Sequence, residues 1–100
     1  MKIYVLVKCV TFDNRGAVGE ICDVQVFRTK EEAKAIIQGN IDMEIKYSHL
    51  YEWDIRKNEH DTESRPYYLE VNYDAYDGDG NSDHYQWQVR EFEVKEEENE

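Results

Sequence analysis

Residues 2–12 constrain the fold more than any other segment, because both alternating sides of this stretch are apolar. One side carries Ile3, Val5, Val7 and Cys9, and the other carries Tyr4, Leu6, Val10 and Phe12. A β-branched and aromatic run of this kind is typical of a strand inside a sheet with both faces covered. Turn residues at 13–19 and a second alternating run at 20–28 then predict a β-hairpin.

A helix is expected to follow this hairpin. The sequence Thr29-Lys30-Glu31-Glu32 has the spacing of a capping box, and apolar residues follow at helical intervals at Ala33, Ile36, Ile37, Ile41 and Ile45. We therefore predict a helix over residues 30–48. From Ile41 the odd positions are also apolar, so a strand that begins at Ile41 is the alternative.

The remaining chain alternates as strands do. We predict a strand over residues 51–57, a loop at 58–66 around the single proline, and a strand from Tyr67 to Tyr76. A hairpin loop at 77–82 leads to a last strand over residues 84–94. The apolar positions change side within that strand, which predicts a β-bulge near Arg90 and Glu91.

These elements predict an α+β fold with the order ββαβββ. We expect a mostly antiparallel sheet of four to five strands with one helix packed on one face. Residues 1–95 are expected to form a single domain. The glutamate-rich residues 96–100 have nothing to bury and are expected to be a disordered tail.

The negative charge of the chain lies in its second half. Residues 1–50 carry seven basic and seven acidic side chains, whereas residues 51–100 carry five basic and sixteen acidic ones, which gives the net charge of −11. Phosphate recognition needs Lys and Arg, so we expect no direct binding to nucleic acid or to anionic membrane. A basic protein surface is the expected kind of partner, although the charge could equally serve solubility alone.

Two cysteines, Cys9 and Cys22, are too few for a disulfide framework. The apolar run at the N-terminus is too short for a signal peptide, so a cytoplasmic protein with reduced cysteines buried as small hydrophobic residues is expected. A disulfide across the first hairpin is the alternative. No catalytic motif or cofactor fingerprint occurs, so we expect a protein that is not an enzyme and needs no cofactor.

The spacing Asp77-x-Asp79-x-Asn81-x-Asp83 is that of the start of a calcium loop. Ser82 stands where an EF-hand needs Gly, however, and Gln88 stands in place of the bidentate Glu. The three histidines lack metal-ligand spacing, so no metal site is predicted. A small-ligand or calcium-binding domain that uses the loop from Asp74 to Asp83 remains the alternative function.

The favoured function is a protein-interaction module. In the strand that contains Tyr68 and Tyr76, these tyrosines alternate with apolar positions, which places them on the polar side of the sheet. Tyrosines among carboxylates suit a surface rich in Arg and Lys, through charge pairing and cation–π contact. The predicted partner-binding residues are Asp54, Tyr68, Glu70, Asp74, Tyr76, Asp77, Asp79 and Asp83. Either a monomer or a homodimer, paired through an edge strand, fits the pattern.

Three stretches carry a resemblance to small proteins of phages and prophages of gut bacteria. They are residues 3–7 (IYVLV), residues 24–33 (VQVFRTKEEA) and residues 84–94 (HYQWQVREFEV). That group has no assigned activity, so the resemblance implies an origin. Small acidic phage proteins are often inhibitors that dock onto host or defence proteins, sometimes as mimics of nucleic-acid charge. By analogy of class, the resemblance implies such a role here.

Overall fold

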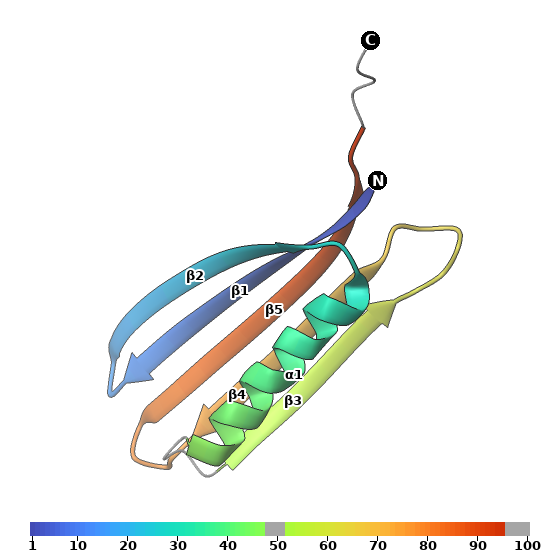
Figure 1. The fold of residues 1–100 in the computed structure, drawn as a ribbon. Helices are drawn as coiled ribbons and strands as arrows, with labels where there is room; N and C mark the ends of the chain where they lie inside the picture. The colour runs from blue at the N-terminus through green and yellow to red at the C-terminus, as the bar shows by residue number, and fades with distance from the viewer. Residues whose placement is uncertain (48–51, 96–100) are drawn as a thin grey trace.

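The computed structural model of this 100-residue chain describes residues 1–47 and 52–95. The elements follow in the order β1 (Lys2–Asn14), β2 (Ala17–Phe27), α1 (Lys30–Tyr47), β3 (Glu52–His60), β4 (Tyr68–Tyr76) and β5 (Asn81–Glu93), as Figure 1 shows. The strands form one sheet with the order β2-β1-β5-β4-β3, and all neighbours are antiparallel. The predicted α+β class and the order ββαβββ are therefore confirmed.

A two-residue turn joins β1 to β2. Arg15 and Gly16 both have positive φ angles, 53° and 94°, as a type I′ turn requires. The Asp13 carboxylate accepts a hydrogen bond from the Gly16 amide at 2.8 Å. Asn14 and Ala17 are the paired residues that flank the turn, and this fixes the register of the whole hairpin.

Helix α1 begins at its predicted cap and runs past the point where the alternative strand would start. The Thr29 hydroxyl accepts from the Glu32 amide at 3.2 Å and donates to the Glu32 carboxylate at 3.0 Å. Ile41 is buried within the helix, so the strand beginning at Ile41 is wrong. Residue 48, the predicted last residue of the helix, and the acidic tail at 96–100 lie outside the described residues.

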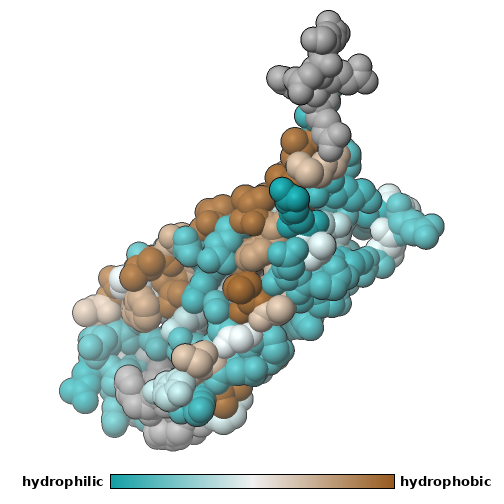
Figure 2. Space-filling model, in the orientation of Figure 1, coloured by the Kyte–Doolittle hydropathy of each residue, from teal (hydrophilic) through white to brown (hydrophobic). Residues whose placement is uncertain are grey.

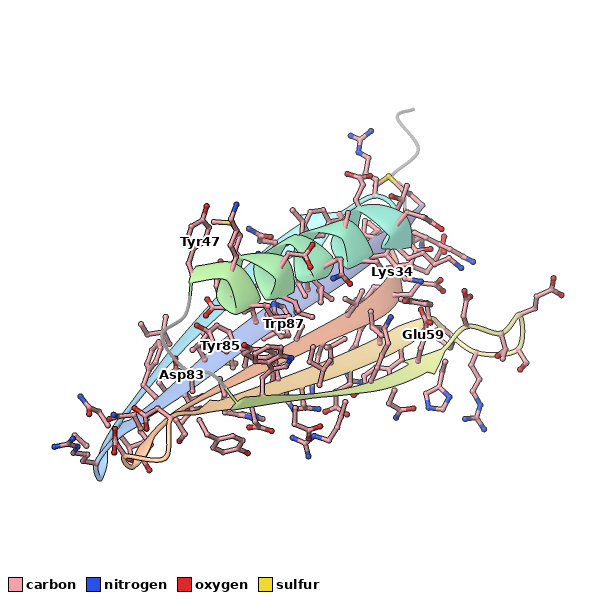
Figure 3. All side chains as sticks on the ribbon, turned by 90° about the horizontal axis from the view of Figure 1, so that it is seen from below. Lys34, Tyr47, Glu59, Asp83, Tyr85 and Trp87 are labelled. Atoms are coloured by element: carbon pink, nitrogen blue, oxygen red, sulfur yellow. A yellow bond between two sulfur atoms is a disulfide. The ribbon has the colours of Figure 1, made fainter. Side chains whose placement is uncertain are left out.

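One buried cluster contains side chains from the helix and from three strands. Ala33, Ile37 and Ile41 of α1 share it with residues of β1, β4 and β5, and Figure 3 shows the helix lying along one face of the sheet. We call this the helix face and the opposite side the open face. The Trp87 indole is fully buried and donates to the Asn40 side chain at 3.2 Å.

The predicted alternation in β4 and β5 is confirmed. The helix-face members are buried: Tyr67, Leu69, Val71, Tyr73, Ala75, Tyr85, Trp87 and Val89. Trp53 lies on the same face, since it pairs with Ala75, but 48% of its surface is exposed.

The predicted end of β3 and the predicted bulge in β5 are both wrong. Strand β3 continues to His60, although a loop was expected from residue 58. Two ion pairs connect this end of the strand to α1 and explain the continuation. Lys34 binds Glu59 at 3.1 Å, and Lys30 binds Asp61 at 2.7 Å. No bulge interrupts β5 in the described residues, where its register against β1 is continuous through Arg90.

The apolar residues of β5 change sides because the last of them, Phe92, lies on the open face. Phe92 is 48% exposed and pairs with Ile3 on that face. Strand β1 was expected to be covered on both faces, yet Ile3, Val5 and Val7 are only half-buried and α1 lies on the other side. Figure 2 shows apolar residues along the β2 side of the molecule. Val24 and Val26 of β2 pair with Val7 and Val5 on the open face and are 59% and 60% exposed.

Candidate functional site

The open face brings together five of the eight predicted partner-binding residues. In the register of β3, β4 and β5, Asp54 pairs with Asp74 and Asp74 pairs with His84. All five lie on the same side of the sheet, because residues two apart along β4 point the same way and Asp54 lies opposite one of them. They are Asp54, Tyr68, Glu70, Asp74 and Tyr76.

Asp74 is the electrostatic centre of this group. Its two carboxylate oxygens contact Arg56 Nη2 and His84 Nδ1, each at 2.5 Å, and only 17% of its side chain is exposed. Arg56 also binds Asp54, with 3.4 Å between Nε and Oδ2. The Arg56 guanidinium therefore already neutralises part of the negative charge that was predicted to bind a basic partner.

The two tyrosines of this face differ in their surroundings. The Arg90 guanidinium lies 5.0 Å from the centre of the Tyr68 ring, and the His60 ring lies on Tyr68 at 6.2 Å. Tyr76 is 44% exposed at the other end of β4. A cation stacked on Tyr68 shows that this face accommodates cation–π geometry, and Tyr76 is the more accessible ring for an incoming cation.

The turn between β4 and β5 explains the spacing that resembled a calcium loop. Asp77 Oδ1 accepts from the amides of Asp79 and Asn81 at 2.8 and 3.1 Å, and Oδ2 accepts from the Asn81 side chain at 2.6 Å. Gly78 and Gly80 supply the positive φ angles of the turn. The Asp77 carboxylate thus holds the hairpin, as an aspartate at the start of a turn commonly does.

Asp83 lies on the other side of the sheet from the five open-face residues. It pairs with Phe12 and Ala75, which are helix-face positions, and Figure 3 shows it near the end of the sheet that carries Tyr85. Burial raises the pKa of Tyr85, and a hydrogen bond with the Glu44 carboxylate raises this pKa further. Burial also raises the pKa of Tyr73, whose hydroxyl has no hydrogen-bond partner. Alternation along β4 and β5 places both rings on the helix face, but it does not indicate their acidic neighbours.

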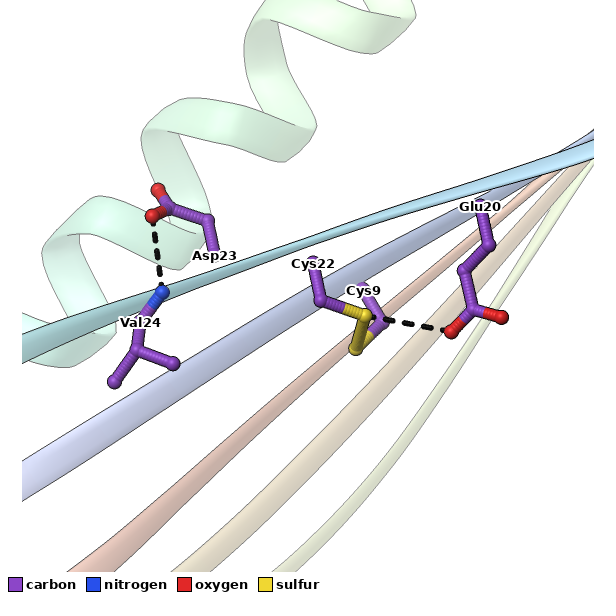
Figure 4. Close-up of a disulfide and its surroundings, with 5 residues drawn as sticks. All are labelled: Cys9, Glu20, Cys22, Asp23 and Val24. Carbon is purple, nitrogen blue, oxygen red and sulfur yellow. Dashed lines mark hydrogen bonds between the residues drawn. A yellow bond between two sulfur atoms is a disulfide. The ribbon is translucent and has the colours of Figure 1, made fainter.

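The cysteines form a disulfide on the open face, which corrects the expectation of buried thiols. Cys9 and Cys22 are opposite each other in β1 and β2 and are bonded (Figure 4). Cys22 is exposed and its sulfur lies 3.3 Å from the Glu20 carboxylate. Among the described residues, Cys9, Glu20 and Cys22 are the one group of three potential metal ligands close together, and its sulfurs are bonded to each other. No such group lies in the β4–β5 turn among the described residues, so the calcium hypothesis for that turn gains no support.

A groove beside the helix was not predicted from the sequence. It has a volume of about 460 Å³ and lies between α1 and β3, and it is lined by Ile41 of α1, Ile55 of β3 and Leu69 of β4. A helix is about 10 Å wide and neighbouring strands are about 4.8 Å apart, so one helix covers only two or three strands. A sheet of five strands with a single helix must therefore leave its outer strands uncovered on the helix face.

Lys34, which lines this groove, also belongs to a polar cluster with Glu59 and Tyr67. The Tyr67 hydroxyl donates a short hydrogen bond to Glu59, and Lys34 binds the same carboxylate at 3.1 Å. The bond from Tyr67, together with Lys34, lowers the pKa of Glu59, although burial opposes this. Burial and the Glu59 carboxylate raise the pKa of Tyr67 far above its ordinary value. These groups satisfy one another, so the cluster is a structural junction between α1 and β3.

No known family model, curated protein or solved structure matches this chain. Among the described residues, no helix is both long and apolar enough to span a bilayer.

Proposed function

We propose that this chain is a non-enzymatic protein-interaction module that binds a basic protein surface through the open face of β3, β4 and β5. A phage-type acidic inhibitor, or a mimic of nucleic-acid charge, is the specific form that the sequence resemblance favours. The observation that carries the proposal is the convergence of Asp54, Tyr68, Glu70, Asp74 and Tyr76 on the side of the sheet away from α1.

The exposed part of this surface lies toward the β4–β5 turn. Asp54 has 62% of its side chain exposed, Tyr76 is 44% exposed, and Asp79 follows in the adjacent turn. Carboxylates beside an accessible tyrosine offer an incoming Arg or Lys both an ion pair and a ring to stack on. Tyrosine is also enriched among the residues that dominate binding energy.

A substitution at Arg56 tests the proposal, because it is expected to strengthen binding and not to weaken it. Arg56 binds both Asp54 and Asp74, so it competes with any cation that a partner brings to these carboxylates. Arg56→Gln is expected to strengthen binding to a basic partner, because it removes the cation that Asp54 and Asp74 share. Arg65→Gln is the matched control, since it removes the same charge from the loop after β3, beside Pro66 and away from this face.

The experiment is affinity capture with four immobilised proteins: the wild type and the variants Arg56→Gln, Arg65→Gln and Tyr76→Ala. Gut-bacterial lysate is applied at low salt and eluted at high salt, because exposed charges are screened at high ionic strength. Retained basic proteins are identified by mass spectrometry, purified and titrated by calorimetry.

We expect one basic protein whose Kd increases about tenfold with Tyr76→Ala, decreases with Arg56→Gln and is unchanged with Arg65→Gln. Two outcomes contradict the proposal. In one, no basic protein is retained by the wild type at low salt. In the other, Arg56→Gln and Arg65→Gln change the affinity equally, which means that only the net charge matters.

A further inference from the structure

The free edge of β2 is the more apolar of the two strand edges of the sheet. Strand β2 lies at one end of the strand order and pairs only with β1, and every residue from Ala17 to Val26 is exposed. It carries Val18, Ile21, Val24 and Val26, each at least 59% exposed, and no Lys, Arg or Pro. A long apolar edge without such residues is a template for pairing with another strand.

The other edge is different in kind. Strand β3 carries Asp54, Arg56, Lys57 and Glu59 within nine residues. Charged side chains, Lys above all, are the usual means by which a protein prevents its edges from pairing. The β2 edge carries only two charged residues, Glu20 and Asp23, and no Lys, so the two edges of this sheet are not equivalent.

The turn at Arg15 and Gly16 determines which backbone groups of β2 are free. In a hairpin with a two-residue turn, the residues that flank the turn exchange hydrogen bonds, and such pairs then alternate along the ladder. The odd-numbered residues of β2 thus bond to β1, and the even-numbered ones point their backbone groups outward. Val24 confirms this assignment, because its amide donates to the Asp23 side chain at 2.9 Å and not to β1 (Figure 4).

We propose that the edge of β2 is a homodimer interface, in which the β2 strands of two copies pair antiparallel about a two-fold axis at Val24. The axis residue is even-numbered, so Val24 of each copy exchanges two backbone hydrogen bonds with Val24 of the other. The Asp23 carboxylate, which covers this amide in the single chain, is released when the strands pair.

This register is self-complementary on both faces. On the open face Cys22 comes opposite Val26 of the second copy, and Glu20 comes opposite Arg28, the first residue after the end of β2. On the helix face Ile21 comes opposite Phe27, and Asp23 comes opposite Gln25. Shifting the axis to residue 23 would place Asp23 against Asp23, and shifting it to residue 22 would place Ile21 against Asp23. Opposite charges across strands are favourable and like charges are not, so the axis at Val24 is preferred.

The charge distribution also favours a second copy at this edge. Residues 1–50 carry equal numbers of acidic and basic side chains, and they include both β1 and β2. The acidic residues of β3 and β4 lie at the opposite edge of the sheet. Two copies joined through β2 therefore place their acidic halves at the far ends of the combined sheet, where their mutual repulsion is weakest.

The test is the molar mass in solution, measured by sedimentation equilibrium over a wide range of concentration. The wild type is expected to have twice the monomer mass, with no covalent dimer on a non-reducing gel. Val24→Pro removes an amide that points away from β1, so it is tolerated at an edge strand and is expected to give a folded monomer.

Val18→Pro is the matched control. It makes the same chemical change on the same edge, but residue 18 would lie opposite residue 30 of the second copy, where β2 has already ended. This variant is expected to remain a dimer, and circular dichroism checks that both proline variants keep the fold. Glu20→Arg and Arg28→Glu are each expected to weaken the dimer severalfold, and the double variant is expected to restore it.

Several results would overturn the proposal. They are a wild type that is monomeric at every concentration, a species larger than a dimer, a dimer held by a disulfide, or a Val24→Pro variant that still dimerises. If the double variant of Glu20→Arg and Arg28→Glu dimerises no better than the sum of the two single effects predicts, the register centred on Val24 is wrong.

Discussion

Four tyrosines make the stability of this fold sensitive to alkaline pH. Burial is the first cause of the raised pKa of Tyr4, Tyr67, Tyr73 and Tyr85, and nearby carboxylates add to it. A phenol is neutral when protonated, and its pKa in the unfolded chain is about 10. Because the folded-state pKa is higher, the stabilisation is fully present below about pH 10 and is lost as the pH rises above it.

The size of this loss can be calculated for Tyr67 and Tyr85, which are 3% and 7% exposed. At about pH 11, ionisation of each phenol in the unfolded chain alone lowers the free energy of unfolding by about 1.4 kcal/mol. Together these two rings cost about 3 kcal/mol, a large part of the 5–15 kcal/mol that is typical of a small domain.

Urea unfolding followed by far-UV circular dichroism, at about pH 8 and about pH 11, measures this loss. Tyr67→Phe and Tyr85→Phe lower the stability at both pH values but are each expected to reduce the alkaline loss by about 1.4 kcal/mol. Leu69→Ala is a control for destabilisation without a phenol and is expected to keep the full loss. If Tyr67→Phe and Tyr85→Phe also keep it, these phenols ionise in the folded protein and the reasoning is wrong.

Three further predictions concern stability. Trp87→Ala is expected to lower the free energy of unfolding by about 3–5 kcal/mol, because a fully buried indole leaves a cavity, as urea titration will show. Reduction of the disulfide, which links residues 13 positions apart, is expected to cost at most about 3 kcal/mol, measured as the urea midpoint with and without a phosphine reductant; an unchanged midpoint would mean that the turn alone closes the hairpin. The lowered pKa of Glu59 gives stability that is present above about pH 4.3 and lost as the pH falls through the folded-state value. Glu59→Gln should remove this acid-side loss, and an unchanged acid unfolding curve would contradict it.

The alternation of apolar residues was enough to predict most of the fold. The order ββαβββ, the helix start at the Thr29 cap and the buried side of β4 all follow from local patterns. The errors arose where contacts distant in sequence decide the outcome. Strand β3 extends because Lys34 of the helix binds Glu59, and no periodicity in residues 58–66 encodes that contact.

The candidate site was only partly predictable for the same reason. Alternation placed Tyr68, Glu70 and Asp74 on one side, and the structure adds Asp54 from a neighbouring strand. The sequence could not show that Arg56 and His84 contact Asp74, since both pairings depend on the register between strands. Asp83 was grouped with them because the last strand was predicted to begin at residue 84, whereas β5 begins at Asn81 and alternation then places Asp83 on the side of Tyr85 and Trp87.

The two tryptophans stand in opposite environments, and this gives the protein two separate optical reporters. Trp87 is fully buried and its ring stacks 5.6 Å from that of Tyr85, whereas Trp53 is 48% exposed on the edge strand β3. Trp87 should therefore emit at short wavelength and resist quenching by iodide, and Trp53 should emit at long wavelength and be quenched readily. With Trp53→Phe the fluorescence follows unfolding of the interior alone. With Trp87→Phe it follows the surroundings of Trp53 on β3, so the same instrument can distinguish changes at the β3 edge from loss of the interior.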